Sequence, residues 1–234
     1  KKNKSCGRRS RRKENNFMSK TVHPYSFRLG IIRNWKSRWF NLKKYRHFLK
    51  TDTIIRETLE KQLHDMYVES IETERTPAVF HVIVKTSRPG LIIGRKGEGA
   101  DKLKKDIKKI FHKFKLEAPQ EIKLTIEEVR FPETHAKIVA QMIAESLEKR
   151  MNFKRVIKQH LEKVMANKEV KGVKISLSGR LGGAEMGRYE WLKKGRIPRQ
   201  TLRSDIDFAR WKARLPYGYI GIKVWIYKGE KFDN

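Results

Sequence analysis

Residues 91–103 read LIIGRKGEGADKL, and this stretch decides how the rest of the sequence is interpreted. An apolar turn, Leu91-Ile92-Ile93, leads into Gly94-Arg95-Lys96-Gly97, and an amphipathic helix is predicted directly after it. The two glycines let the backbone bend sharply and approach a sugar-phosphate chain, while amide groups at the start of the next helix can point at phosphate oxygens. The two basic residues add positive charge at the same place. The stretch is therefore typical of a loop that binds a phosphate backbone.

Glycine spacings of this kind also arise by chance and occur in other phosphate-binding loops. A nucleotide-binding P-loop needs GxxxxGK[ST], whereas the run from Gly94 to Gly99 continues with Ala100-Asp101. A dinucleotide-binding loop needs GxGxxG after a strand and an acidic residue about 20 positions later, and the sequence has neither. The apolar residues before the loop, the two cations inside it and the helix after it favour the GxxG clamp of a KH domain, which grips single-stranded RNA.

The flanking apolar patterns predict a compact α+β unit around this loop. Thr51-Asp52 is interpreted as the N-cap of a first helix, and apolar residues then repeat at helical spacing. The predicted order is helix, strand, strand, short helix, glycine turn, helix, strand. The strands are expected at residues 69–75, 79–85 and 121–129, and the long second helix contains residues 103–114.

A second α+β unit is predicted after Pro132. Two helices are followed by a strand, a turn with the sequence SGRLGG, a helical piece and two strands joined across Pro216-Tyr217-Gly218. The helices are expected at residues 134–150, 153–167 and 185–194, and the strands at 173–177, 206–214 and 219–227.

The charge balance indicates a polyanionic partner. The chain has 56 Lys and Arg against 26 Asp and Glu, a formal net charge of +30, and such self-repulsion destabilises a fold unless a polyanion is bound. No apolar run approaches the roughly 18–20 residues that span a bilayer, and no apolar core of a signal peptide is present. The basic residues are spread over the whole chain, which favours nucleic acid over a membrane surface.

Enzyme and metal chemistry find little support in the sequence. Cys6 is the single cysteine, so no intramolecular disulfide is expected, and the seven histidines lack ligand spacing. Asp205 and Asp207 are expected to pair with the nearby Arg203 and Arg210. Without a nucleophile, base and carboxylate set, we expect no catalysis, no cofactor and no small-molecule substrate.

The N-terminal region divides into two parts. Residues 1–17 have the composition of a disordered basic tail, which is either dispensable upstream sequence before Met18, an RNA-clasping arm or the remnant of an organelle transit peptide. Residues 18–50 interleave aromatic and basic side chains. We expect the rings to pack on the first helix and the charges to bind RNA.

A basic stripe is predicted on the helix that starts at Phe153. Lys154, Arg155 and Lys158 fall within roughly 100° of one another around a helix, beside an apolar stripe that includes Ile157. For an isolated helix, a solvated face remains the more frequent explanation. The glycine-rich turn after residue 177 is predicted to be structural, with Arg180 as a phosphate contact.

Three long segments resemble one known family. They are HPYSFRLGIIRNWKSRWF, RPGLIIGRKG, and SGRLGGAEMGRYEWLKKGRIPRQTLRSDIDF followed by YGYIGIKVWIYKGE. In this order they are similar to the bacterial-type small-subunit ribosomal protein S-three family, and the match runs from about residue 18 to residue 230. The third segment is far more specific than a glycine spacing.

This resemblance implies an α+β fold with a type II KH domain at residues 51–131 (α-β-β-α-α-β). A C-terminal α/β domain with a mainly antiparallel sheet and two helices is implied at residues 132–230, followed by a short tail, 231–234. It also implies a structural role in the small subunit, on the ribosomal RNA of the head and beside the proteins S-ten and S-fourteen. The expected location is a cytoplasmic ribosome, or an organellar one if residues 1–17 are a transit remnant.

The family is further implicated in holding and unwinding messenger RNA at the entry channel, through a basic trio that is commonly Arg-Arg-x-x-Lys. In this sequence the trio falls on Lys154, Arg155 and Lys158, and lysine at the first position keeps the charge but loses the planar fork of arginine. Seven arginines are expected to contact ribosomal RNA: Arg28, Arg33, Arg38, Arg180, Arg188, Arg196 and Arg203.

From the residues alone, two rival functions stay open. One is a regulatory KH module, free or attached to a GTPase or nuclease, and the other is an activity on DNA outside the ribosome. A GTPase would need a P-loop and a nuclease would need clustered carboxylates, and neither pattern is found.

Overall fold

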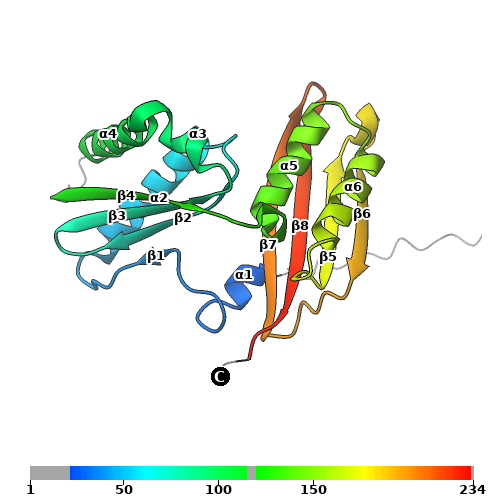
Figure 1. Cartoon of the computed structure of the whole chain (residues 1–234), viewed down its shortest axis with the longest axis horizontal. Helices are drawn as coiled ribbons and strands as arrows, with labels where there is room; N and C mark the ends of the chain where they lie inside the picture. The colour runs from blue at the N-terminus through cyan, green and yellow to red at the C-terminus, as the bar shows by residue number, and fades with distance from the viewer. Residues whose placement is uncertain (1–21, 115–119, 233–234) are drawn as a thin grey trace, which may run out of the picture.

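The computed structural model describes residues 22–114 and 120–232. Two four-stranded sheets, each covered by helices on one face, lie side by side (Figure 1). The basic tail at residues 1–17, including Cys6, lies outside the described residues. The two sheets correspond to the two α+β units that the sequence predicts.

The N-terminal sheet has the strand order β1-β2-β3-β4. β2 and β3 pair antiparallel, β4 pairs parallel to β3, and β1 adds a short parallel edge beside β2. Helices α2 and α4 pack apolar side chains on one face of this sheet. The order α-β-β-α-α-β of a KH domain is confirmed. The elements are β1 (Ser37–Arg38), α2 (Tyr45–Gln62), β2 (Val68–Arg75), β3 (Val79–Thr86), α3 (Pro89–Ile93), η1 (Arg95–Gly97), α4 (Glu98–Lys113) and β4 (Glu121–Glu128).

The predicted start of the first helix is wrong. α2 begins at Tyr45, so Thr51 and Asp52 lie inside the helix and a domain boundary at residues 50/51 would cut it. Thr51 Oγ1 donates to the carbonyl of His47 at 2.8 Å, a back-bond that a mid-helix threonine can make. The buried Asp52 carboxylate accepts from Trp39 Nε1 at 2.7 Å. Thr51 and Asp52 are residue types that often cap helices, but here Thr51 bonds to the preceding turn of the helix and Asp52 bonds to Trp39 outside it.

The C-terminal sheet is entirely antiparallel, in the order β6-β5-β8-β7. The predicted helix pair is confirmed as α5 and α6, which bury their apolar faces against one side of the sheet. This large core positions the start of α6 and the ends of the strands. The elements are η2 (Pro132–Thr134), α5 (Ala136–Glu148), α6 (Phe153–Met165), β5 (Gly172–Gly179), η3 (Leu181–Gly183), β6 (Arg188–Gly195), β7 (Ser204–Leu215) and β8 (Gly218–Glu230).

The helical piece predicted at residues 185–194 is wrong, because these residues form strand β6 for most of their length. β6 pairs with β5 without interruption, from Arg188 opposite Gly179 to Gly195 opposite Gly172. Tyr189 and Trp191 lie two residues apart and therefore on the same face of β6. Aromatic residues favour strands when a partner strand offers a surface to pack on. The pairing decides the structure of a segment whose own sequence is ambiguous.

The segment before α2 spans both domains. Its helix α1 (Pro24–Phe27) packs against β7 of the C-terminal domain, and its strand β1 joins the KH sheet. Arg28, directly after α1, is completely buried. Its guanidinium donates to the carbonyls of Pro24 at 3.0 Å, Arg199 at 2.9 Å and Thr201 at 2.9 Å. We call this segment, residues 22–44, the strap; its buried Arg28 helps to fix it to the C-terminal domain.

Further contacts join the two domains directly. Arg33 of the strap forms an ion pair with Asp205 at 2.6 Å. Side chains of α5 and of the turn before it reach α2, β2 and the loop between them. These contacts are Lys137 with Glu60 at 2.8 Å, His135 with Glu69 at 2.7 Å, and the Tyr67 hydroxyl, which donates to Glu145.

Replacing Arg28 should destabilise the protein. In Arg28→Met the carbonyls around the guanidinium lose their donor, and hydrogen bonds to a charged group are strong, so we expect the free energy of unfolding to fall by about 2–4 kcal/mol. Urea unfolding measures this value. The matched control is Arg46→Met on the exposed side of α2, which should change stability by less than about 0.5 kcal/mol. Equal unfolding midpoints for the two variants would contradict the role of Arg28.

Stability should also depend on His160, which is buried in α6 beside Ser146 of α5, 3.2 Å from its hydroxyl. Burial, and to a smaller extent repulsion from the charge of Lys163, lowers the pKa of His160 from 6.5 to about 4. Between these values the unfolded chain binds the proton more readily, so unfolding becomes easier by up to about 1.4 kcal/mol per pH unit as pH falls from 6.5 to 4. Urea unfolding at pH 7 and pH 5 checks this, with His160→Gln as the comparison, because that variant should lose this part of the pH dependence. The same pH dependence in both proteins would rule the effect out.

Candidate nucleic-acid interface

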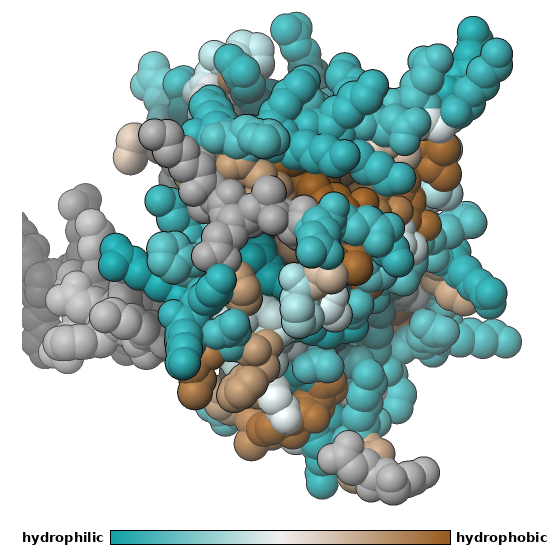
Figure 2. All heavy atoms as spheres, turned by 90° about the vertical axis from the view of Figure 1, so that its left-hand side faces the viewer, coloured by the Kyte–Doolittle hydropathy of each residue, from teal (hydrophilic) through white to brown (hydrophobic). Residues whose placement is uncertain are grey.

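The glycine loop lies between α3 and α4, at the KH end of the molecule. Gly94 has φ 70°, Lys96 φ 53° and Gly97 φ 84°, so the chain reverses through three left-handed residues before α4 begins. Lysine adopts this conformation only at some cost in backbone energy. Arg95 and Lys96 are both exposed. Hydrophilic side chains cover most of the face that the KH domain presents in Figure 2.

Close contact between the backbones of α3 and α4 fixes this loop. A Cβ added at Gly99 would lie 2.4 Å from the carbonyl oxygen of Ile92, so only glycine fits there. The N-cap of α4 is Gly97, which has no side chain to accept hydrogen bonds from the first turn. Amides at this helix start therefore remain available for a phosphate oxygen. The geometry agrees with a GxxG clamp.

The basic stripe on α6 is exposed as its spacing predicts. Lys154, Arg155 and Lys158 face solvent, while the opposite side of the helix, including Ile157, is buried. The helix start is fixed by Asn152, whose side chain accepts from the amide of Lys154 at 3.0 Å. The stripe is therefore held on a rigid, capped helix.

The fold places further basic residues at the same end of the C-terminal domain. α6 begins there, β5 ends, β6 begins and β7 turns into β8 (Figure 1). A Cβ at Gly182 would lie 3.9 Å from the Phe153 ring, so the turn after β5 touches the start of α6. Arg180 donates to the carbonyl of Ala184 at 3.0 Å, which orders this turn. We call this surface the α6 end, and it comprises Lys154, Arg155, Lys158, Arg180 and Arg188.

The other predicted arginines are spread over different places. Arg28 is used differently from what we expected, because its buried guanidinium is bound to backbone carbonyls, and we do not retain it as an RNA contact. Arg196 is exposed beyond β6, at the end of the domain opposite the α6 end. Three others form ion pairs: Arg33 with Asp205, Arg38 with Glu72 and Glu74, and Arg203 with Glu230.

Two acidic residues have other partners than the sequence suggests. Asp205 pairs with Arg33 of the strap and, at 3.3 Å, with Lys231, rather than with its neighbour Arg203. Asp207 accepts from the amide of Ala136 at 2.7 Å and so caps the start of α5. The expected local pairing is wrong because both carboxylates serve contacts between distant segments.

The aromatic rings of the strap divide into two groups. Trp39 packs on α2, with ring centroids 5.3 Å from Tyr45 and 5.4 Å from Phe48, as expected. Trp35 and Phe40 are 63% and 88% exposed, so the expectation that all these rings pack on the first helix is wrong for them.

Within the described ranges, no group of three or more His, Cys, Asp or Glu side chains could hold a metal ion. No helix in the same part of the chain is long and apolar enough to cross a membrane.

Comparison with known families supports this geometry. Residues 54–134 match the family model described as KH domain, and residues 143–226 match the one described as ribosomal protein S3, C-terminal domain. The small ribosomal subunit protein uS3 of Maridesulfovibrio salexigens is 44% identical over 218 residues, which cover 93% of this chain and 98% of the relative. The uS3 of Desulfovibrio desulfuricans is 45% identical over 93% of this chain and 98% of the relative. The uS3 of Myxococcus xanthus is 45% identical over 91% of this chain and 93% of the relative.

Gly99→Ala should disturb the clamp. The added methyl group meets the α3 backbone, so we expect α3 and α4 to move apart, a loss of about 1–3 kcal/mol in stability and weaker binding of single-stranded RNA. Gly90→Ala is the matched control, because nothing lies within 4 Å of a Cβ at that position. Urea unfolding and fluorescence anisotropy with a labelled oligonucleotide give the two readouts. If the variants behaved alike, the close approach would not matter for the clamp.

Proposed function

Since the chain belongs to the ribosomal protein S3 family, we propose that it binds the ribosomal RNA of the subunit head and holds messenger RNA at the entry channel. Membership makes it a structural, non-enzymatic constituent of the small ribosomal subunit with a KH domain for RNA. We also propose a cytoplasmic ribosome as its location, because the relatives named above are bacterial.

The observation that carries the messenger proposal is the α6 end. Lys154, Arg155 and Lys158 stand in one exposed stripe on a capped helix, and none of them forms an ion pair with a carboxylate in the part of the chain that the structure describes. Unpaired cations on a rigid helix can bind successive phosphates of a single strand without first breaking a salt bridge. Such binding opposes re-pairing of a messenger hairpin, since the strand held on the protein is unavailable to its complement.

We assign the ribosomal RNA contacts to residues outside the stripe formed by Lys154, Arg155 and Lys158. The glycine loop combines amides at a helix start with Arg95 and Lys96, and its geometry fits a phosphate backbone. On the C-terminal domain, Arg180 and Arg188 are exposed beside this stripe at the α6 end, and Arg196 is exposed at the opposite end of the domain. Because many phosphates are neutralised in this arrangement, affinity should fall steeply with salt.

The resemblance also implies protein neighbours, S-ten and S-fourteen, and we propose that the strap meets one of them. Its exposed rings, Trp35 and Phe40, offer apolar surface that a soluble monomer would otherwise leave in water. Aromatic side chains of this kind are enriched at protein interfaces.

Replacing the α6 stripe should impair translation of structured messengers. In Lys154→Ala/Arg155→Ala/Lys158→Ala we expect passage through a stable hairpin to slow about tenfold, which corresponds to losing about 1.4 kcal/mol at the step that opens the helix. Unstructured messengers should be translated at nearly the normal rate. Reconstituted translation with paired messengers that differ only in the hairpin measures both rates.

The matched control removes three lysines from the opposite end of the same helix and the turn beyond it. Lys163→Ala/Lys168→Ala/Lys171→Ala has the same change in charge and should translate both messengers normally. Equal slowing of structured and unstructured messengers by the α6 stripe variant would contradict the proposal that this stripe holds messenger RNA.

A further inference from the structure

The C-terminal sheet has one face that α5 and α6 do not cover (Figure 1). Strand register places aromatic and basic side chains together on this open face. Lys174 lies opposite Trp225, and Phe208 lies opposite Trp225 on the other side. One step along the sheet, Ser176 is flanked by Trp191 and Lys223.

We call this surface the open-face platform. It consists of three aromatic residues and three cations: Trp191, Phe208, Trp225, Lys174, Arg210 and Lys223.

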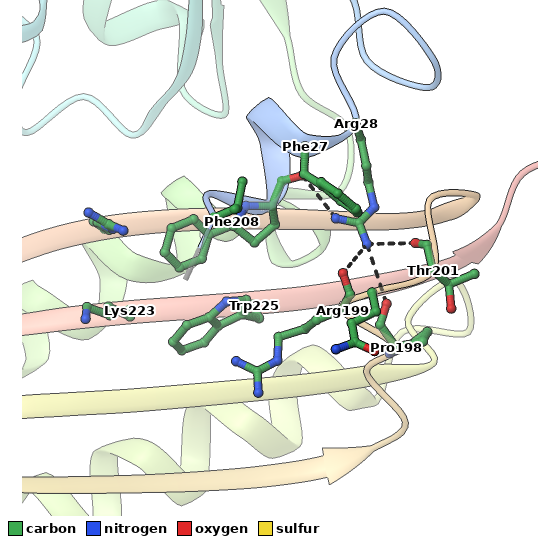
Figure 3. A pocket seen from close by; sticks show the side chains of 12 residues that line it. Phe27, Arg28, Pro198, Arg199, Thr201, Phe208, Lys223 and Trp225 are labelled. Carbon is green, nitrogen blue, oxygen red and sulfur yellow. Dashed lines mark hydrogen bonds between the residues drawn. The ribbon is translucent and has the colours of Figure 1, made fainter. Parts of the chain in front are cut away.

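A cleft of about 670 Å³ adjoins the platform, between the strap and strands β7 and β8. Phe27 of the strap forms one wall, and Phe208 and Trp225 lie on adjacent strands below it (Figure 3), with ring centroids 5.0 Å apart. Arg199 and Lys223 lie on the same side of the sheet as these rings. The volume is within the range of sites for small ligands, and the lining combines the 40% exposed ring of Phe27 with two cations, Arg199 and Lys223. The rings of Phe208 and Trp225 are 9% and 8% exposed and form the apolar base of the cleft.

The charge on the platform is of one sign. Lys174 Nζ lies 4.5 Å from the Trp191 ring centroid and 5.4 Å from that of Trp225, so a cation stands between two rings. None of the platform cations pairs with a carboxylate among the described residues. Burial lowers the pKa of Lys174, and repulsion from Arg199 and Lys193 lowers it further. Charges that repel one another in this way favour a polyanionic ligand.

Exposed aromatic surface distinguishes RNA from an acidic protein as the occupant. Trp191 is 50% exposed and Tyr189, on the same strand face, is 55% exposed, so flat rings are open to stacking. An antiparallel four-stranded sheet with helices behind it and rings and cations in front is one arrangement that binds unstacked bases. An acidic peptide would use the cations but would leave the exposed rings of Tyr189 and Trp191 in water.

We propose that the open-face platform binds single-stranded RNA, with bases stacked on Trp191 and in the cleft and with phosphates on Arg210 and Lys223. The proposal rests on the RNA-binding function stated above and deepens it by adding a second RNA surface. This surface lies on the other side of the sheet from α6, so it binds a different RNA segment from the strand at the α6 end.

Ultraviolet cross-linking of the full-length chain to a single-stranded 12-mer oligonucleotide tests the proposal, with the cross-linked peptides identified by mass spectrometry. The wild-type chain should give cross-links in β6, at Tyr189 or Trp191, in addition to any at the glycine loop. In Arg210→Gln/Lys223→Gln we expect the β6 yield to fall about tenfold, because two charge-assisted phosphate contacts are lost, while the yield at residues 94–97 is unchanged. Both replaced side chains are exposed, and an unfolding midpoint equal to wild type verifies the fold.

Three comparisons make the test specific. Lys163→Gln/Lys168→Gln removes the same charge elsewhere and should leave the β6 yield within about twofold, a bound taken from the weak effect of distant surface charges in salt. The α6 stripe variant should also leave it unchanged, so failure of the messenger proposal and failure of this one are separate results. A duplex of the same sequence should cross-link at least about tenfold less at β6, because its bases remain stacked.

Absence of a β6 cross-link in the wild-type chain would overturn the proposal, and so would equal yields from duplex and single strand. A wild-type β6 yield in Arg210→Gln/Lys223→Gln would also overturn it. If that variant in addition failed to enter small subunits, the open face would instead be the binding site of a neighbouring protein.

Discussion

The buried guanidinium of Arg28 is the contact on which the arrangement of the two domains depends. It donates to carbonyls of its own helix and of residues 199 and 201, so it ties the strap to the loop between β6 and β7. A lysine could not satisfy these acceptors from one planar group. Once α1 is fixed in this way, the following residues lead to β1 on the KH sheet, and Arg33 reaches Asp205 on the way. The same contact holds Phe27 over the sheet, and thereby forms one wall of the cleft.

The acidic residues explain where the excess positive charge is found. The carboxylate of Asp52 accepts a hydrogen bond from Trp39, and that of Asp205 forms an ion pair with Arg33 of the strap. The carboxylate of Asp207 caps the start of α5. Such carboxylates hold distant segments together because their hydrogen bonds are made in partly dehydrated surroundings. Cations at the α6 end and on the open-face platform have no carboxylate partner in the described part of the chain. Three carboxylates are thus used at contacts between distant segments, while the cations of the α6 end and the open-face platform are available for RNA.

Sequence patterns predict the elements that have a long apolar repeat or a special loop. α4, α5 and α6 repeat apolar residues over several turns, and the glycine loop needs the conformations that Gly94 and Gly97 provide. The errors concern residues whose partners are remote in the sequence. Thr51-Asp52 has the composition of a helix cap, but the carboxylate is bound to Trp39. Arg28 is a residue type that often contacts RNA, but its guanidinium is bound to backbone carbonyls, several of them in residues 198–201. No local pattern reveals such partners.

The open-face platform shows the same limit most clearly. Its residues lie between positions 174 and 225 on four strands, and only the register of β6-β5-β8-β7 brings them to one face. Trp191 belongs to a segment that its own sequence allows to be helical, where it would not lie beside Lys174. Because the apolar core behind the sheet is shared with α6, the platform and the α6 end are two sides of one rigid layer. RNA bound on either side therefore meets a surface already fixed by packing, so little conformational entropy is lost on binding.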